Sequence, residues 1–331
     1  MSPSIEREAL GAASASALVR RFPPLARLPH AALGAFPTPV VDASALSTDL
    51  WLKRDDLTGE PLGGNKVRAL EWLLGGVRPA ERVVTVGAMG STHVLATATY
   101  AQRLGARVTV YRWPQEASPA ALEVSRRIER VAREHAIART VAGAYARAAV
   151  ARLRGARWIP AGGSSPLGAL GYVAAALELA EQIVRGVLPA PRRIVVPLGS
   201  GGTTAGLWLG AAIAGLDAEI VGVRVVPRVV ANRRRVRSLA HGAARLIERL
   251  TSERVARPRT NALRIVHEEY GGAYGRETAS GHAAARRFAE WCGLSLDATY
   301  SAKALAAVFS APQEGPTLFW LTFDPRILVH T

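Results

Sequence analysis

The sequence predicts an α/β protein with parallel sheets and helices on both of their faces. Short β-branched segments alternate with segments of helical apolar spacing along most of the 331 residues, which is the pattern of parallel sheets. Glycine-rich stretches follow three of the expected strands, after Val86, Ile159 and Leu198. Because ligands of such sheets bind at the carboxyl ends of strands, these stretches are candidate binding loops. The length allows two domains or one large unit.

Each element follows from its local pattern. Strands are expected where β-branched and apolar residues cluster: at residues 49–53, 82–86, 107–111, 157–159, 193–198, 219–226, 263–266 and 317–322. Helices are expected where apolar residues recur every three or four positions: at residues 66–74, 94–104, 119–134, 166–185, 235–250, 277–292 and 301–309, with one more that ends near 214. The Pro-rich segment 20–40 is expected to wrap the core as irregular chain.

The chain is strongly basic, with 42 Lys and Arg against 26 Asp and Glu and a net charge of +16. Such a charge can indicate nucleic-acid binding. The arginines, however, are spread over helical segments, and few aromatic residues accompany the densest group at residues 233–237. We therefore interpret this group as a solvated helix face and expect no nucleic-acid partner. An arginine-driven nucleic-acid binder with an inherited enzyme fold stays an alternative.

No uninterrupted apolar run approaches the length of about eighteen residues that a membrane-spanning helix needs, so we expect no membrane contact. The Ala/Ser-rich segment 9–19 loosely resembles a signal-peptide centre. Because Glu6 and Glu8 precede it, we expect a surface helix or a tail instead. Cys292 is the one cysteine, which excludes an intrachain disulfide and suits the reducing cytoplasm.

The strongest chemical signal is Lys66, which follows two glycines and Asn65. The glycines free the backbone, and Asn65 is a good N-cap, so Lys66 falls in the first turn of a helix. The helix dipole disfavours an ammonium there and so favours the neutral, nucleophilic amine. The chain has only three lysines, Lys53, Lys66 and Lys303, so each is informative. The alternative is a solvated first-turn residue.

The loop after the strand at 193–198 is a candidate anion site, formed by Gly199, Ser200, Gly201, Gly202 and Thr203. Its glycines let successive N–H groups converge at the start of a helix, which suits a single phosphate group. It lacks the Lys-Ser/Thr of a nucleoside-triphosphate loop and the spacing of a dinucleotide loop. The alternative is a tight strand-to-helix turn.

Ser91, Thr92 and His93 stand at another helix start, where N–H and hydroxyl groups would seat a carboxylate. Helix capping is the alternative. Tyr274 and Tyr300 either pack or line a pocket for proton transfer. No grouping of His, Cys and acidic residues has metal-ligand spacing, so no catalytic metal is expected. A nucleophilic lysine, one phosphate site and one carboxylate site together indicate pyridoxal 5'-phosphate acting on an amino acid.

These residues carry a family resemblance. The sequence resembles the pyridoxal-phosphate enzymes of the D-cysteine desulfhydrase and 1-aminocyclopropane-1-carboxylate deaminase group, from about residue 22 to residue 322. The most specific part is Lys-Arg-Asp-Asp at 53–56 followed by Gly-Gly-Asn-Lys-Val-Arg-Ala-Leu-Glu at 63–71. The resemblance implies the tryptophan-synthase-β-like fold, with two three-layer, parallel-sheet domains.

The resemblance also implies domain limits and site roles. The expected large cofactor domain comprises residues 1–62 and 173–331, and the small domain comprises residues 63–172. In the family the lysine at this position holds the cofactor covalently. The site residues expected are Lys66, Ser91, Tyr274 and Tyr300 for catalysis; Asn65, Lys66, Thr92, Ser301 and the loop of residues 199–203 for the cofactor; and Ser91, Thr92 and His93 for the substrate carboxylate.

Departures from the family bear on the substrate. Thr92 stands where the family has asparagine, and Phe323-Asp324 stands where it has Gly-Gly, so this pair is expected to crowd or recharge the pocket. Ser301 takes the position that faces the pyridine nitrogen, where the desulfhydrase branch has a hydroxyl residue and the deaminase branch a glutamate. A hydroxyl does not keep that nitrogen protonated as a carboxylate does, which favours β-elimination over opening of a cyclopropane ring.

The expected function is a lyase that eliminates the β-substituent of a small amino acid and gives pyruvate and ammonia, with Lys66 moving the α-proton. The alternatives are a deaminase of the cyclopropane acid, a synthase that uses the same aminoacrylate, and a cofactor-binding homologue with lost or repurposed activity. We expect a cytoplasmic homodimer.

Overall fold

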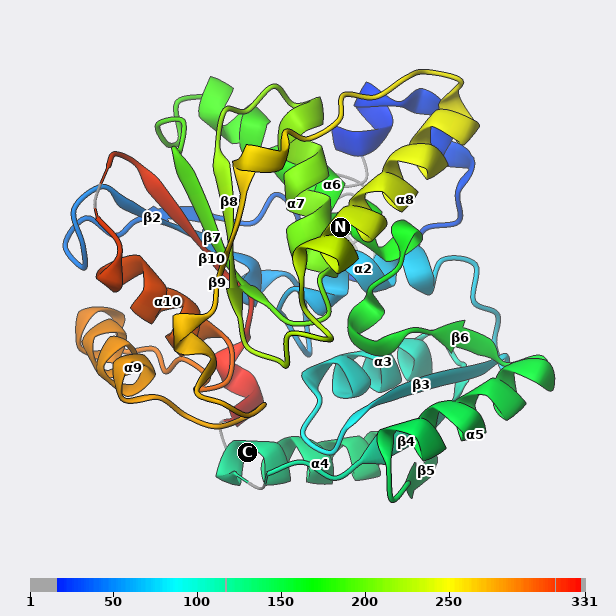
Figure 1. Ribbon diagram of the computed structural model, residues 1–331. Helices are drawn as coiled ribbons and strands as arrows, with labels where there is room; N and C mark the ends of the chain where they lie inside the picture. Colours follow the sequence, from blue (N-terminus) through cyan, green and yellow to red (C-terminus); the bar gives the residue numbers. More distant parts are fainter. Residues whose placement is uncertain (1–16, 117, 313, 329–331) are drawn as a thin grey trace, which may run out of the picture.

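The computed structural model describes residues 17–116, 118–312 and 314–328, so residues 9–16 of the expected surface helix or tail lie outside it. The rest of that segment, residues 17–19, is helical, but Ala17 and Leu18 are buried in the core, so the surface position expected for them is wrong. Two sheets organise the chain (Figure 1). The larger has the strand order β1-β2-β10-β7-β8-β9 and the smaller has the order β5-β4-β3-β6. Neighbouring strands pair in parallel, apart from β1 and β2, which are antiparallel.

The strands are β1 Val40–Asp42, β2 Leu50–Arg54, β3 Arg82–Ala88, β4 Arg107–Trp113, β5 Glu134–Ile137, β6 Arg157–Ile159, β7 Arg193–Leu198, β8 Glu219–Arg224, β9 Leu263–Val266 and β10 Thr317–Leu321. The main helices are α2 Lys66–Leu73, α3 Thr92–Arg103, α4 Pro119–Val131, α5 Val141–Leu153, α6 Pro166–Val184, α7 Gly202–Ile213, α8 Arg233–Thr251, α9 Ala279–Cys292 and α10 Ser301–Ser310. The predicted alternation is thereby confirmed.

Three described elements were not predicted. β1 is a short antiparallel edge strand inside the Pro-rich segment. β5 is mostly exposed and begins at Glu134, the residue at which the preceding helix was predicted to end. That helix ends at Val131 instead. α5 buries only Ala144 and Ala148, so its sequence carries almost no apolar periodicity to predict a helix.

The larger sheet is covered on both faces, because alternate residues of a strand point to opposite sides. In β7, Ile194 and Val196 pack with α6, α7 and α8, whereas Val195 packs with α9 and α10. Figure 1 shows these two groups of helices on either side of the sheet. The smaller sheet follows the same rule: Val83 faces α3 and α4, and Val84 packs with residues of α5.

α6 is a core helix of the larger unit. Within the described residues it alone is long and apolar enough to cross a membrane by length and composition, but 72% of that stretch is buried inside the fold. This helix contains Glu178 and Glu181, so it is not an uninterrupted apolar run and was not a candidate in the sequence analysis. The smaller sheet lies within residues 82–159, and residue 172 lies inside α6. The predicted domain limits at 62/63 and 172/173 stay a prediction.

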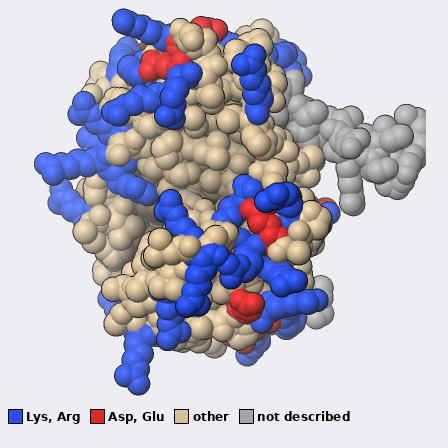
Figure 2. Space-filling view, turned by 90° about the vertical axis from the view of Figure 1, so that its right-hand side faces the viewer, with Lys and Arg blue, Asp and Glu red and all other residues tan. Residues whose placement is uncertain are grey.

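Basic side chains cover much of the surface. Figure 2 shows Lys and Arg spread over one face, with uncharged surface between them and few acidic side chains. At the start of α8, Arg234 and Arg237 are exposed while Val236 is buried. Arg233 and Arg235 of the same group donate to the backbone carbonyls of Thr260, Leu263 and Ser164. The exposure of Arg234 and Arg237 agrees with a solvated helix face, and the absence of a nucleic-acid partner stays a prediction.

Candidate active site

A cavity of about 360 Å³ lies where the carboxyl ends of strands from both sheets meet. Ala88 and Trp113 end β3 and β4 on one side, while Gly199, Val226 and Thr322 follow β7, β8 and β10 on the other. Parallel sheets bind ligands at this edge, because the helices that follow the strands turn their N-termini toward it. The cavity is therefore the candidate active site.

Lys66 is the one lysine that lines this cavity. α2 begins at Lys66, as predicted, and no hydrogen bond or ion pair of its amine is found among the described residues. Burial lowers its pKa to about 8, and the nearby carboxylate of Asp297 opposes the shift. Lys53 is instead buried in an ion network, and Lys303 donates to the carbonyl of Tyr270. The cavity thus holds a half-buried amine that loses its proton more easily than an ordinary lysine does.

The two glycines before Asn65 are required by close packing. A Cβ on Gly63 would lie 1.9 Å from the carbonyl oxygen of Asp56. Gly64 has φ of +96°, and a Cβ there would lie 2.9 Å from the carbonyl oxygen of Thr322. Such contacts leave no room for a side chain, so the glycines let the chain before Lys66 pass close to two other segments.

Asn65 does not cap the helix with its side chain, contrary to the sequence prediction. Its Nδ2 donates instead to Thr203 Oγ1 at 3.0 Å. The competing partner lies 138 residues away, so the local sequence could not reveal it. This bond ties the helix of Lys66 to the predicted anion loop.

The predicted anion loop lies on the cavity wall in full, from Gly199 to Thr203. Gly201 has φ of +95°, which a side chain would strain, and α7 begins at the next residue. The N–H of Gly202 donates to Ser164 Oγ at 3.0 Å, so it is not free for a ligand. Thr204, the next residue along, lines the cavity and has a buried hydroxyl without a partner in the described chain.

Ser91, Thr92 and His93 also line the cavity, at the start of α3. Ser91 is the N-cap, and its Oγ accepts the N–H of Val94 at 3.4 Å. Its hydroxyl therefore caps the helix and can also donate to a ligand in the cavity. Burial and the charge of Lys66 lower the pKa of His93 to about 3. Its ring nitrogens lie 3.0 Å and 3.4 Å from the hydroxyls of Thr85 and Thr97. His93 is therefore neutral and already bonded.

Tyr274 and Tyr300 meet in the cavity wall. Their hydroxyl oxygens are 2.7 Å apart, and their rings pack edge to face at 6.1 Å. Burial raises the pKa of both phenols, so both are protonated at neutral pH. Asp297, which the sequence reading missed, accepts the N–H groups of Tyr300 and Ser301 and so fixes the start of α10. An acidic residue just before a helix was the signal that could have revealed it.

Ser301 is the predicted site residue that does not line the cavity. Its side chain is fully buried in the first turn of α10, and its Oγ makes no hydrogen bond of normal geometry. Of the divergent pair, Phe323 does line the cavity. Asp324 does not: it accepts the N–H of Gly63 at 2.8 Å and pairs with Arg326. The expectation that Asp324 recharges the pocket is therefore wrong, whereas crowding by Phe323 stands.

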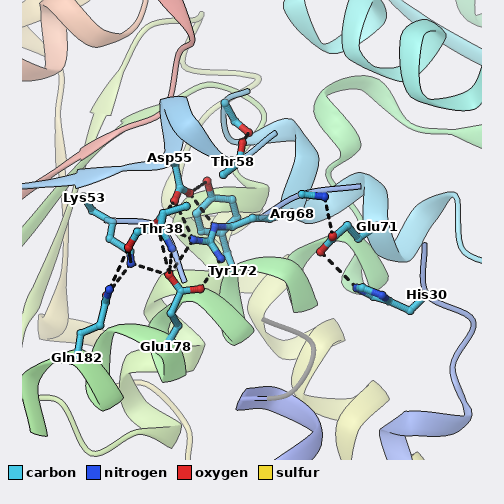
Figure 3. Close-up of polar contacts among 12 residues, drawn as sticks. His30, Thr38, Lys53, Asp55, Thr58, Arg68, Glu71, Tyr172, Glu178 and Gln182 are labelled. Carbon is cyan, nitrogen blue, oxygen red and sulfur yellow. Dashed lines mark hydrogen bonds and ion pairs between the residues drawn. The ribbon is translucent and has the colours of Figure 1, made fainter. Parts of the chain in front are cut away.

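A buried ion network fixes the helix that carries Lys66 (Figure 3). Arg68 binds Asp55 through Nε and a terminal nitrogen, both at 2.8 Å, and Glu178 at 2.9 Å. Lys53 binds Glu178 at 2.5 Å, and Tyr172 donates to Asp55 at 2.7 Å. Two cations thus offset two anions, which is the condition under which buried charges are tolerated. The network joins β2, α2 and α6.

Comparison with known proteins agrees with this geometry. Residues 31–320 match the family described as pyridoxal-phosphate dependent enzyme (PALP). The chain belongs to this family. It is 36% identical over 324 residues to nocardicin C-9' epimerase of Nocardia uniformis subsp. tsuyamanensis, covering 90% of this chain and 94% of the relative. It is 30% identical over 321 residues to D-cysteine desulfhydrase of Salmonella choleraesuis, covering 89% and 94%.

A solved structure described as an ACC deaminase homologue superposes with a TM-score of 0.76 and 30% identity, over 92% of this chain and 94% of the other. The predicted fold class and family are therefore confirmed, and the cofactor of the family is pyridoxal 5'-phosphate. Among the described residues no three His, Cys, Asp or Glu side chains come together as a metal site requires.

The cavity fits this cofactor on its own chemistry. It offers one half-buried amine, at Lys66, that has no hydrogen-bond partner among the described residues and can react with an aldehyde. It also offers one glycine-rich helix start for one phosphate, beside the unpartnered buried hydroxyl of Thr204. Buried polar atoms normally have partners, so such an orphan hydroxyl at this point indicates a missing ligand.

The pKa of Lys66 gives a testable pH dependence. A pKa of about 8 instead of 10.5 raises the neutral fraction of the amine near pH 7.5 by about two orders of magnitude. In cofactor-free protein, the rate of covalent cofactor uptake should rise with pH and level off above about 8. Stopped-flow absorbance would measure it, and a rate that keeps climbing toward pH 10.5 would contradict the lowered pKa.

Proposed function

We propose that the protein is a pyridoxal-phosphate-dependent lyase that removes the β-substituent of an amino acid, as a D-cysteine desulfhydrase does. Lys66, whose amine lines the cavity and has a lowered pKa, supports this most directly. Its amine would take the α-proton. The bond from Cβ to the substituent then breaks, and its electron pair leaves with the substituent. The released aminoacrylate adds water and gives pyruvate and ammonia.

The cofactor would be held from three sides. When bound, it supplies an electron sink for the charge that proton removal leaves on the α-carbon. Lys66 would hold it covalently, and the loop of residues 199–203 would bind its phosphate, with Thr204 as a further donor. Thr92 would approach the phenolic oxygen of the ring. Ser301, whose hydroxyl is buried and unpartnered, stays the predicted neighbour of the pyridine nitrogen.

Tyr274 and Tyr300 would serve the leaving group. Because their hydroxyls lie 2.7 Å apart, one proton lies between them and the other remains available to a departing substituent. Ser91 and Thr92, at the N-terminus of α3, would seat the substrate carboxylate. His93 is neutral, so it would help to position the groups of this carboxylate site and would add no charge to it.

The relationship to an epimerase supports a second candidate function. Epimerisation of an α-carbon also begins with proton removal, which would again fall to Lys66. It differs only in that the proton is returned from the opposite face and no substituent leaves. Both functions use the same cavity, so the product distinguishes them.

Product analysis tests the proposal. Holoenzyme would be incubated with D-cysteine, β-chloro-D-alanine, L-serine and 1-aminocyclopropane-1-carboxylate, and keto acid would be measured. The proposal predicts pyruvate from a substrate with a β-leaving group and poor turnover of the cyclopropane acid. Preferred turnover of the cyclopropane acid would overturn the role of Ser301. Exchange of the α-proton with solvent deuterium in the absence of pyruvate would favour the epimerase.

The setting of the enzyme is part of the same proposal. We infer that it works in the cytoplasm as a homodimer, without membrane or nucleic-acid partners. The lone Cys292 supports the cytoplasm, and the dispersed arginines support the absence of a nucleic-acid partner. We also propose the division into a large domain of residues 1–62 and 173–331 and a small domain of residues 63–172.

A further inference from the structure

Part of the cavity wall has no role in the proposed function. The lysine, the anion loop, the start of α3 and the two tyrosines account for its polar side. One apolar part of the remaining wall comes from both sides of the cleft; it consists of Trp113, Val141, Tyr145, Val226, Pro227 and Val230. We call this set the apolar wall.

The apolar wall is partly open to solvent. Val141 is 48% exposed, Tyr145 42% and Val230 47%, and all three line the cavity. Large apolar side chains that gather at the mouth of a cleft mark a binding surface, because water is a poor neighbour for them. Tyr145, on α5, lies close enough to Arg235, at the start of α8, for that charge to act on its phenol. The two halves of the wall therefore face each other.

The wall is also aromatic and uncharged. The rings of Trp113 and Tyr145 stack with centroids 6.0 Å apart and planes 22° from parallel, and Trp158 meets Tyr145 edge to face at 6.1 Å. A further aromatic ring can extend such a cluster. No Asp, Glu or Arg lines the cavity, and its one ammonium, that of Lys66, is already assigned. A charged substrate side chain would therefore find no further charged partner among the residues that line the cavity.

We propose that the substrate carries an uncharged aromatic or branched apolar substituent on its β-carbon, and that Trp113, Tyr145 and Val230 seat this substituent. The inference rests on the proposed elimination and specifies its leaving group. The hydrophobic gain of a ligand grows with the apolar area that it buries, so a thiol or a hydroxyl would draw little affinity from this wall. A substituent of the size of a benzyl group would cover it.

The binding of unreactive amino acids to the holoenzyme tests the proposed site for the apolar substituent, which we call the seat, without any turnover. Alanine and phenylalanine, each as both enantiomers, have no β-leaving group, and their binding would be followed by the visible absorbance of the cofactor. Phenylalanine is expected to bind about tenfold tighter than alanine or better, the effect of burying one large side chain. Equal affinity for the two in the wild-type protein would overturn the proposal.

Variants locate the effect. Trp113→Ala and Tyr145→Ala should each weaken phenylalanine binding by about tenfold while alanine binding changes by less than about twofold. Tyr145 is partly exposed, so this variant should fold even if Trp113→Ala does not. The matched control is Leu153→Ala, on the same helix, 88% exposed and outside the cavity lining, which should change neither affinity. Equal weakening of both ligands by both variants would indicate a merely structural role and contradict the seat.

The failure of the seat and the failure of the proposed function give different results. Pyruvate from S-benzyl-cysteine faster than from cysteine supports both. Pyruvate from cysteine together with equal binding of alanine and phenylalanine refutes the seat and keeps the elimination. Tight phenylalanine binding without pyruvate from either thioether or thiol keeps the seat and refutes the elimination.

Discussion

Replacing Lys66 by alanine is expected to lower pyruvate release by about a thousandfold or more, because the group that moves the α-proton is lost. The covalent link to the cofactor should disappear with it. Both effects follow from one feature of the structure: this amine is the cavity's own lysine and has no other partner among the described residues. Steady-state rates and the amount of cofactor retained after gel filtration measure them.

Lys303→Ala is the matched control for this loss. Lys303 is buried and donates to the carbonyl of Tyr270, but it does not line the cavity. Its removal should cost a hydrogen bond and some stability while covalent cofactor is kept. A Lys66→Ala protein that turns over at the wild-type rate would contradict the assignment of the base.

Breaking the buried ion network should have the largest effect on stability. Arg68→Met leaves Asp55 and Glu178 buried with one cation, Lys53, in place of two. Removing one partner of a buried pair costs about 3–5 kcal/mol of the free energy of unfolding. Because Arg68 lies two residues after Lys66, the variant should also hold its cofactor less tightly. Urea denaturation and cofactor titration would measure the two effects.

An exposed ion pair provides the comparison. Arg259 pairs with Asp217, and both side chains are largely exposed. Arg259→Met makes the same substitution, yet surface pairs contribute about 1 kcal/mol or less. Losses of similar size in the two variants would mean that the network is not what anchors α2.

Local patterns were enough to predict most of the strands and helices and the place of Lys66 at the start of a helix. The strands are rich in β-branched residues, and Lys66 combines a glycine break, a helix start and the scarcity of lysine in the chain. The anion loop was predictable for the same reason, since Gly199–Thr203 is one contiguous stretch between strand and helix. Such signals need no partner from elsewhere in the chain.

What the sequence could not predict depends on distant partners. Asn65 turns away from its cap because Thr203 lies across the cleft, and Asp324 turns away from the pocket because Gly63 and Arg326 bind it. The place of Tyr145 in the cavity wall was also unpredictable, because Tyr145 lies on a helix with almost no apolar periodicity. In each case the direction of a side chain is set by tertiary contacts, which the spacing of residues does not encode.

The central claim is that Lys66 carries the cofactor, and one measurement tests it directly. Borohydride reduction of the holoenzyme fixes the cofactor to the lysine that holds it, and proteolysis with mass spectrometry then locates the modified residue. The structure predicts a label on the peptide that contains Lys66, since this is the lysine in the cavity. A label on Lys53 or Lys303 would contradict the account.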